Sequence, residues 1–146
     1  MRLHSLRNHS LYVAPIRIGL GLLWLALSRV AGLTQASAVL AFGGGLFVIV
    51  FVAFQDPRVA FLRAGEPEPA PPDAQCAGVV EQALAATIPS TLGVTVLAAI
   101  AIWFQPVLAA IMGGISAGLG VAGVLRVWQV PADLWFDRRT KVLYRR

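Results

Sequence analysis

Four long runs of apolar residues divide the chain, over residues 11–33, 36–55, 83–104 and 107–125. The last three contain no charged residue and show no polar face at helical spacing, and each is close to the ~20 residues that cross a hydrocarbon core. Helices that are apolar all round lie in lipid or in the core of a large protein, and 146 residues form no large core. The pattern predicts an all-α integral membrane protein with four transmembrane helices.

The connections between the runs predict two helical hairpins. Residues 34–35 and 103–106 are long enough only for tight turns, so the hairpins would occupy residues 11–55 and 83–125. Residues 56–82 carry charges of both signs and the sequence GEPEPAPPDAQ. Because its prolines disfavour helix and sheet, this stretch is expected to be an extended, solvated linker.

Composition supports a membrane location. Hydrophobic residues make up 58% of the chain and charged residues 13%, with a net charge of +5. The positive charges gather in the basic N-terminal tail (residues 1–10), the linker and the basic, aromatic C-terminal tail (residues 126–146). The positive-inside rule then places both termini and the linker in the cytoplasm, and the protein in the inner cell membrane. No basic stripe with interleaved aromatic residues follows a folded domain, so nucleic acid is not an expected partner.

The first apolar run has an alternative interpretation as a cleaved signal peptide. Basic residues precede the apolar stretch from Ile18 to Leu27, and Ala36-Ser37-Ala38 resembles a signal-peptidase site. Cleavage there would cut the start of the second run, and no exported soluble domain follows it. An intact N-terminus by mass spectrometry would exclude this alternative.

Arg17 and Arg29 are the ionisable residues within the expected spans. A buried arginine in a membrane helix is a candidate site for an anion or a lipid headgroup. The alternative is snorkelling, in which each side chain extends to its nearer membrane interface. Both interpretations remain open at the level of sequence.

The third apolar run contains a cluster of hydroxyl groups around a proline. Thr87, Ser90 and Thr91 flank Pro89, which cannot donate a backbone hydrogen bond and is expected to kink the helix. With Arg17, these hydroxyls form a candidate polar path for an ion or solute. The alternative is a structural kink whose hydroxyls bond to their own helix.

Small residues form strips on the second and fourth runs. Such strips let helix backbones approach closely where lipid gives no hydrophobic driving force. They would serve packing within the chain or association with a second copy or another membrane protein, and in the latter case Gly114→Leu and Gly118→Leu should disrupt the complex. The candidate packing residues are Gly43, Gly44, Gly45, Ala110, Gly114, Gly118 and Ala122.

Aromatic and basic residues are candidates for anchoring at the membrane surface and for contact with anionic lipid headgroups. The C-terminal tail would lie on the membrane, dock on a cytoplasmic partner, or fold as a short hairpin around residues 138–140. The candidate anchors are Trp103, Trp128, Trp135, Arg138, Arg139, Lys141, Arg145 and Arg146.

Motifs for catalysis, cofactors and metals are not recognisable in the sequence. The single cysteine, Cys76, excludes an internal disulfide, and His4 and His9 are a poor basis for a metal site. We therefore expect a non-enzymatic membrane protein that acts as an accessory subunit or homo-oligomer through its glycine-rich helix faces. The competing hypothesis is a small transporter or channel in which Arg17 and the hydroxyls of the third run line the path.

Overall fold

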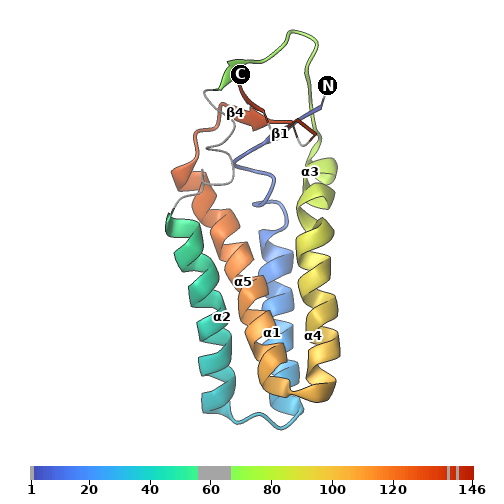
Figure 1. The fold of residues 1–146 in the computed structure, drawn as a ribbon, viewed down its shortest axis with the longest axis vertical. Coiled ribbons are helices and arrows are strands. Elements are labelled where there is room, and N and C mark those ends of the chain that lie inside the picture. The colour runs from blue at the N-terminus through green and yellow to red at the C-terminus, as the bar shows by residue number, and fades with distance from the viewer. Residues whose placement is uncertain (1, 56–66, 138, 141) are drawn as a thin grey trace.

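A bundle of helices with a small sheet at one end makes up the structure (Figure 1). The computed structural model describes residues 2–55, 67–137, 139–140 and 142–146. Within these residues, five α-helices and one π-helical turn pack with a five-stranded mixed sheet. Both ends of the chain lie beside the sheet (Figure 1).

The helices begin and end where the sequence supplies suitable residues. Prolines occupy the first turns of two of them, where a missing N–H costs no helical bond. Gly32 follows the first helix with φ of 98°, the left-handed conformation that ends many helices. The helices are α1 (Ala14–Val30), α2 (Gln35–Gln55), α3 (Val79–Ala86), α4 (Leu92–Phe104) and α5 (Pro106–Gln129), and the π-helical turn η2 (Thr87–Thr91) joins α3 to α4.

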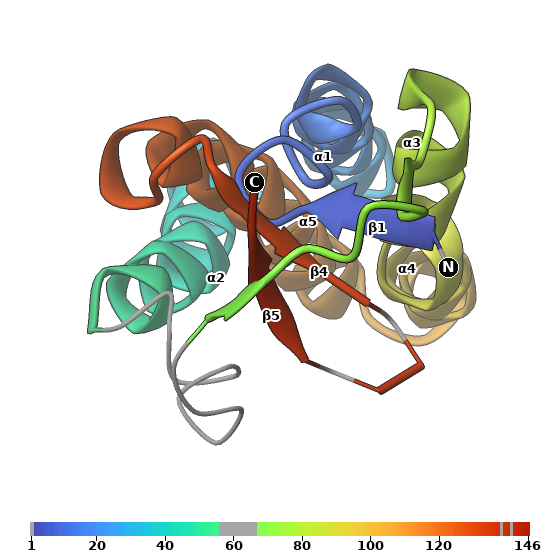
Figure 2. The same ribbon diagram turned by 90° about the horizontal axis from the view of Figure 1, so that it is seen from above.

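Helix α5 is the centre of the bundle. It packs against α1, α2 and α4, whereas α1 has much smaller contacts with α2 and α4. Seen from the sheet end, α1, α2 and α4 surround α5 (Figure 2). The packing of the bundle therefore depends on the surface that α5 offers to its neighbours.

Glycines on α5 allow the backbones of α2 and α5 to approach each other closely. A Cβ atom on Gly114 would overlap the carbonyl oxygen of Phe42, and one on Gly118 would lie 2.9 Å from the Cβ atom of Ile49. From the opposite side, a Cβ atom on Gly45 would overlap the carbonyl oxygen of Ile111. A side chain at any of these positions would force the two helices apart.

A second set of glycines on α5 packs closely against α1. A Cβ atom on Gly113 would lie 2.8 Å from the carbonyl oxygen of Gly21, and one on Gly120 would lie 2.8 Å from that of Ala14. Because Gly113 and Gly114 are adjacent, they point to different sides of the helix. Two glycine faces on one helix thus bring α1 and α2 close to the same α5 backbone.

The sheet is assembled from short segments that are distant in sequence. Its order is β2-β5-β4-β1-β3, with antiparallel pairing at β4–β5 and β1–β4 and parallel pairing at the two outer strands. The strands are β1 (Arg2–Ser5), β2 (Glu68–Pro69), β3 (Gln75–Cys76), β4 (Leu134–Phe136) and β5 (Leu143–Arg145).

Each face of the sheet has a small apolar cluster. One cluster contains Leu6, Phe136 and Leu143 and includes Val130, which directly follows α5. Leu3 and Tyr144 belong to the other, because successive side chains of a strand point to opposite faces. The first cluster fixes the sheet to the end of the bundle.

The prediction of an all-α protein with four transmembrane helices in two hairpins is wrong. The two tails and part of the expected linker form a mixed sheet. Strands of two to four residues are too short to show a period-2 pattern, so their pairing partners were not recognisable. Residues 56–66 of the linker, with Arg58 and Arg63, lie outside the described residues.

The third apolar run is not one uninterrupted helix, because it divides into α3, η2 and α4. By length and composition, two helices in the described part of the chain are apolar enough to cross a membrane. Residues 35–54, in α2, have a mean hydropathy of 2.4, and 11% of the residues in their most apolar stretch are buried, while α5 has a mean hydropathy of 2.0, with 56% buried. Helix α5 is thus largely a core helix, and α2 is an apolar helix on the outside.

We expect Gly114→Ala to destabilise the fold, since its methyl group would meet the Phe42 carbonyl. The cost of such overpacking is about 1–3 kcal/mol, measurable as a lower thermal midpoint in detergent. Gly43→Ala is the matched control, because a Cβ atom there meets nothing within 4 Å and alanine favours helix. Equal midpoints for the two variants would contradict the close approach of α2 and α5.

Candidate functional site

The break between α3 and α4 is the most unusual feature of the bundle. Ile88 has φ of −104° and ψ of 128°, an extended conformation inside an otherwise helical segment. The cause is the following proline, which disfavours helical geometry in the residue before it and has no N–H to donate. Carbonyl groups near the break therefore need donors from elsewhere.

Arg17 supplies these donors from α1. Its side chain is buried, with a relative exposure of 5%. Its Nε donates to Thr91 Oγ1 at 2.7 Å, and its Nη2 donates to the carbonyl oxygen of Ala86 at 2.5 Å and to Ser90 Oγ at 3.0 Å. A planar guanidinium with five donors can satisfy several acceptors at once.

Helix α5 holds the backbone of α1 at the same level. Ser116 donates from its hydroxyl to the carbonyl oxygen of Arg17 at 2.9 Å. A Cβ atom on Gly120 would lie 3.3 Å from the Cβ atom of Arg17. Arg17 thus connects three helical segments, and its position is set by its backbone as well as by its side chain.

Of the predicted polar path, the structure brings together Arg17, Ser90 and Thr91. Thr87 instead donates to the carbonyl oxygen of Ala83 in its own helix at 2.8 Å. In the described part of the chain, neither ion pair involves Arg17, so polar neutral groups surround its charge. The side chain turns inward to the break, whereas Arg29 donates to the Leu33 carbonyl at an exposed position.

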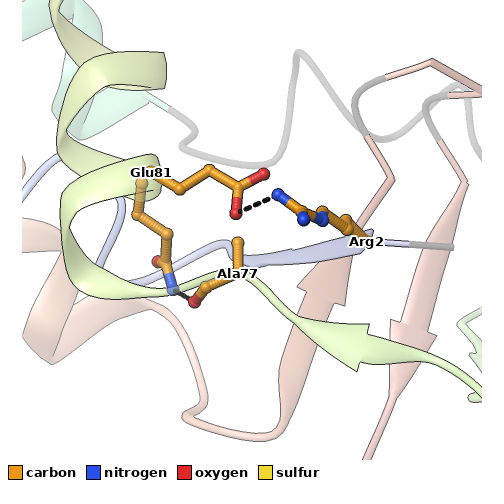
Figure 3. Close-up of polar contacts among 4 residues, drawn as sticks. Arg2, Ala77 and Glu81 are labelled. Carbon is orange, nitrogen blue, oxygen red and sulfur yellow. Dashed lines mark hydrogen bonds and ion pairs between the residues drawn. The ribbon is translucent and has the colours of Figure 1, made fainter.

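A polar cavity of about 940 Å³ lies beside the sheet. Its lining mixes both signs of charge, since β1 contributes Arg2 and His4 and α3 contributes Glu81. The remaining lining residues are Asp73, Gln75, Asp137 and Arg139. Arg2 and Glu81 form an ion pair of 3.0 Å at its edge (Figure 3).

Asp137 organises the turn between β4 and β5. Its Oδ1 accepts from the backbone N–H of Arg139 at 3.1 Å, and its Oδ2 accepts from the Thr140 hydroxyl at 2.9 Å. Burial by itself raises the pKa of Asp137, but these hydrogen bonds outweigh it and lower the pKa below its ordinary value. The carboxylate is therefore ionised and acts as a local turn anchor.

His9 lies where the sheet meets the bundle. Arg126 of α5 donates to Ser10 Oγ at 3.0 Å, and the Ser10 hydroxyl lies 3.3 Å from His9 Nε2. The imidazole also packs edge-on against Phe136 of β4, with ring centroids 5.3 Å apart. Burial and then the charge of Arg126 lower the pKa of His9 to about 4, so the ring is neutral at pH 7.

The candidate packing residues differ in what they contact. Ala110 and Ala122 are buried on α5, and Gly45, Gly114 and Gly118 lie in the α2–α5 contact. Gly43 and Gly44 of α2 have no neighbour within 4 Å of a built Cβ atom. The glycine strip of α5 is therefore used within the chain, while two glycines of α2 face outward.

The candidate membrane anchors differ in how far they are exposed. Trp103 at the end of α4 and Trp128 at the end of α5 are 88% and 87% exposed, while Trp135 is half-buried in β4. Arg138 and Lys141 lie outside the described residues.

The C-terminal tail folds as the β4–β5 hairpin, which was one of the open alternatives. Arg145 pairs with Asp133 at 3.2 Å, and Arg146 donates to the carbonyl oxygen of Ala74 at 3.3 Å. Arg139 is exposed and lines the polar cavity. The two terminal arginines are thus tied to the fold.

Comparisons with protein-family models, curated proteins and solved structures found no match to this chain. Among the described residues, no group of three or more His, Cys, Asp or Glu side chains could hold a metal ion.

We expect the stability of the protein to fall as the pH drops from about 6.5 to 4. His9 has a folded pKa of about 4 against an ordinary value of 6.5, so the unfolded chain binds the proton first and is favoured. The loss should reach at most about 3 kcal/mol, followed as the thermal midpoint in detergent. His9→Gln should remove this part of the pH dependence, and an unchanged slope in that variant would count against the buried neutral imidazole.

Proposed function

We propose that this chain is a non-enzymatic inner-membrane protein whose helix α2 faces lipid and whose sheet lies in the cytoplasm, where it serves as an accessory subunit of a membrane complex. The observation that carries the proposal is the exposure of α2. A core helix of a soluble protein would be covered, but only 11% of the residues in the most apolar stretch of residues 35–54 are buried, at a mean hydropathy of 2.4. So much exposed apolar surface is stable in lipid or against a partner.

The distribution of aromatic residues supports lipid embedding. Trp103 and Trp128 are almost fully exposed at opposite ends of the bundle. From Pro106, beside Trp103, to Trp128, α5 rises about 33 Å, close to the ~30 Å of a hydrocarbon core. Tryptophans at both interfaces are typical of membrane proteins.

The charge distribution supports the proposed orientation. Both termini and the sheet lie at one end of the bundle (Figure 1), and the described part of the chain has at this end the basic residues Arg2, Arg7, Arg126, Arg139, Arg145 and Arg146. At the opposite end, Arg29 is the charged residue near the turn from α1 to α2. The positive-inside rule favours the cytoplasm for the sheet end.

The outer side of α2 is the part of the bundle best suited to a partner helix. Gly43 and Gly44 leave its backbone uncovered, and an apolar groove of about 370 Å³ runs between α2 and α5. Phe47 and Phe51 stack beside it with ring centroids 5.8 Å apart. Small residues at a groove with bulky side chains beside it suit close helix packing in lipid.

The transporter alternative has less support from the geometry. The hydroxyls of Ser90 and Thr91 accept hydrogen bonds from Arg17, and Thr91 is buried. The polar cavity beside the sheet and the apolar groove between α2 and α5 are lined by other residues.

A photoreactive amino acid at Phe47 tests the proposal in native membranes. Irradiation should give a single larger adduct with one membrane protein, because Phe47 is 65% exposed beside the glycines of α2. The matched control is Ile100 on α4, which is 52% exposed and away from the groove; it should give lipid adducts. Lipid adducts alone at both positions would contradict a partner on α2.

A further inference from the structure

Helix α3 is weakly packed compared with the rest of the bundle. Of its eight residues, Gln82 and Ala86 are buried. Val80 and Leu84, on its outer side, are 74% and 58% exposed. An element with few buried apolar contacts depends on its polar contacts to keep its position.

Polar contacts at its upper end tie α3 to the sheet. Glu81 accepts from Arg2 of β1 at 3.0 Å, and Gln82 donates to the carbonyl oxygen of Ala77 at 2.8 Å (Figure 3). The N–H of Ala77 in turn donates to the carbonyl oxygen of Leu3 in β1 at 2.8 Å. The first turn of α3 is thereby bound to the edge of the sheet.

A different set of contacts ties its lower end to α1. Ala86, the last residue of α3, accepts from Arg17, as do Ser90 and Thr91 beyond it. Directly below Ala86, the extended backbone of Ile88 interrupts the helix. A single non-helical residue next to proline is able to absorb a change in φ and ψ, as hinges do.

We propose that α3 is a lever that couples the polar cavity beside the sheet to the Arg17 site within the bundle. Arg2 and Glu81 both line that cavity, so a change of charge there acts directly on the ion pair that holds the first turn of α3 at the sheet. When this contact is lost, α3 turns about Ile88 and the three hydrogen bonds of Arg17 weaken. Coupling between two sites is reciprocal, so loss of the Arg17 hydrogen bonds also weakens the contacts between α3 and the sheet.

The proposal does not depend on membrane embedding or on a partner, since each contact lies within the chain. Hydrogen–deuterium exchange of the full-length protein in detergent micelles, analysed by mass spectrometry, tests it. The variants are Glu81→Gln, which removes an exposed ion pair, and Gln82→Met, which removes a buried hydrogen bond at similar volume. The reporter is the exchange of residues 86–92, beyond the mutated positions.

Exchange of residues 86–92 should accelerate about two- to five-fold in Glu81→Gln, the range that an exposed ion pair supplies, and more in Gln82→Met. The exchange of α5 should stay unchanged. Arg145→Gln is the matched control, because it removes the other exposed ion pair of the sheet end without touching α3. The double variant Arg2→Glu with Glu81→Arg should restore slow exchange.

The reverse direction is tested with Thr91→Val, which removes one acceptor of Arg17. It should accelerate exchange of residues 77–82, whereas Thr95→Val, whose hydroxyl bonds to its own helix, should not. The proposed coupling is contradicted if residues 86–92 keep their exchange rate in Glu81→Gln and Gln82→Met while the exchange of residues 77–82 becomes faster. It is equally overturned if α5 accelerates by the same factor, because that result indicates general unfolding.

Discussion

The close approach of α1 and α2 to the α5 backbone is the constraint on which the rest of the structure depends. Gly113 and Gly120 admit α1, while Gly114 and Gly118 admit α2. With bulkier residues on both faces, neither neighbour would reach the positions seen here. Close approach adds dispersion contacts along both helix interfaces, so the glycines are structural requirements of the bundle.

The position of Arg17 follows from this packing. Once α1 lies against α5, Ser116 and Gly120 place Arg17 opposite the break in the third apolar run. Gly120, which lies against Arg17, precedes Arg126 on α5 by six residues, or about 9 Å along the helix axis. The guanidinium of Arg17 is stable inside the bundle because Thr91, Ser90 and the Ala86 carbonyl accept its hydrogen bonds, and the Ala86 carbonyl at the break in turn needs a donor.

Sequence alone locates the helices well and the sheet poorly. The second apolar run, 36–55, matches α2 within one residue, and the fourth, 107–125, lies inside α5, because apolar length is a strong signal. Pro89 marks the break, and the sequence grouped Arg17 with Thr87, Ser90 and Thr91 as a candidate polar path. The hydrogen bonds that Arg17 makes were not predictable, since they depend on the rotation of α1 against α5. The C-terminal hairpin was one of the open alternatives, but the other strands were missed because pairs such as Arg2 with Gln75 bring together short segments without any local pattern.

The central proposal is that the exposed side of α2 faces lipid and that the sheet lies outside the bilayer. Spin labels at single cysteines introduced at Leu40, Phe47 and Phe51 of α2, in a Cys76→Ser protein reconstituted in liposomes, test it most directly. The account predicts that oxygen relaxes these labels strongly and a water-soluble nickel chelate weakly, with the reverse at Ala132 beside the sheet. Equal access of the nickel chelate to α2 and to Ala132 would contradict it.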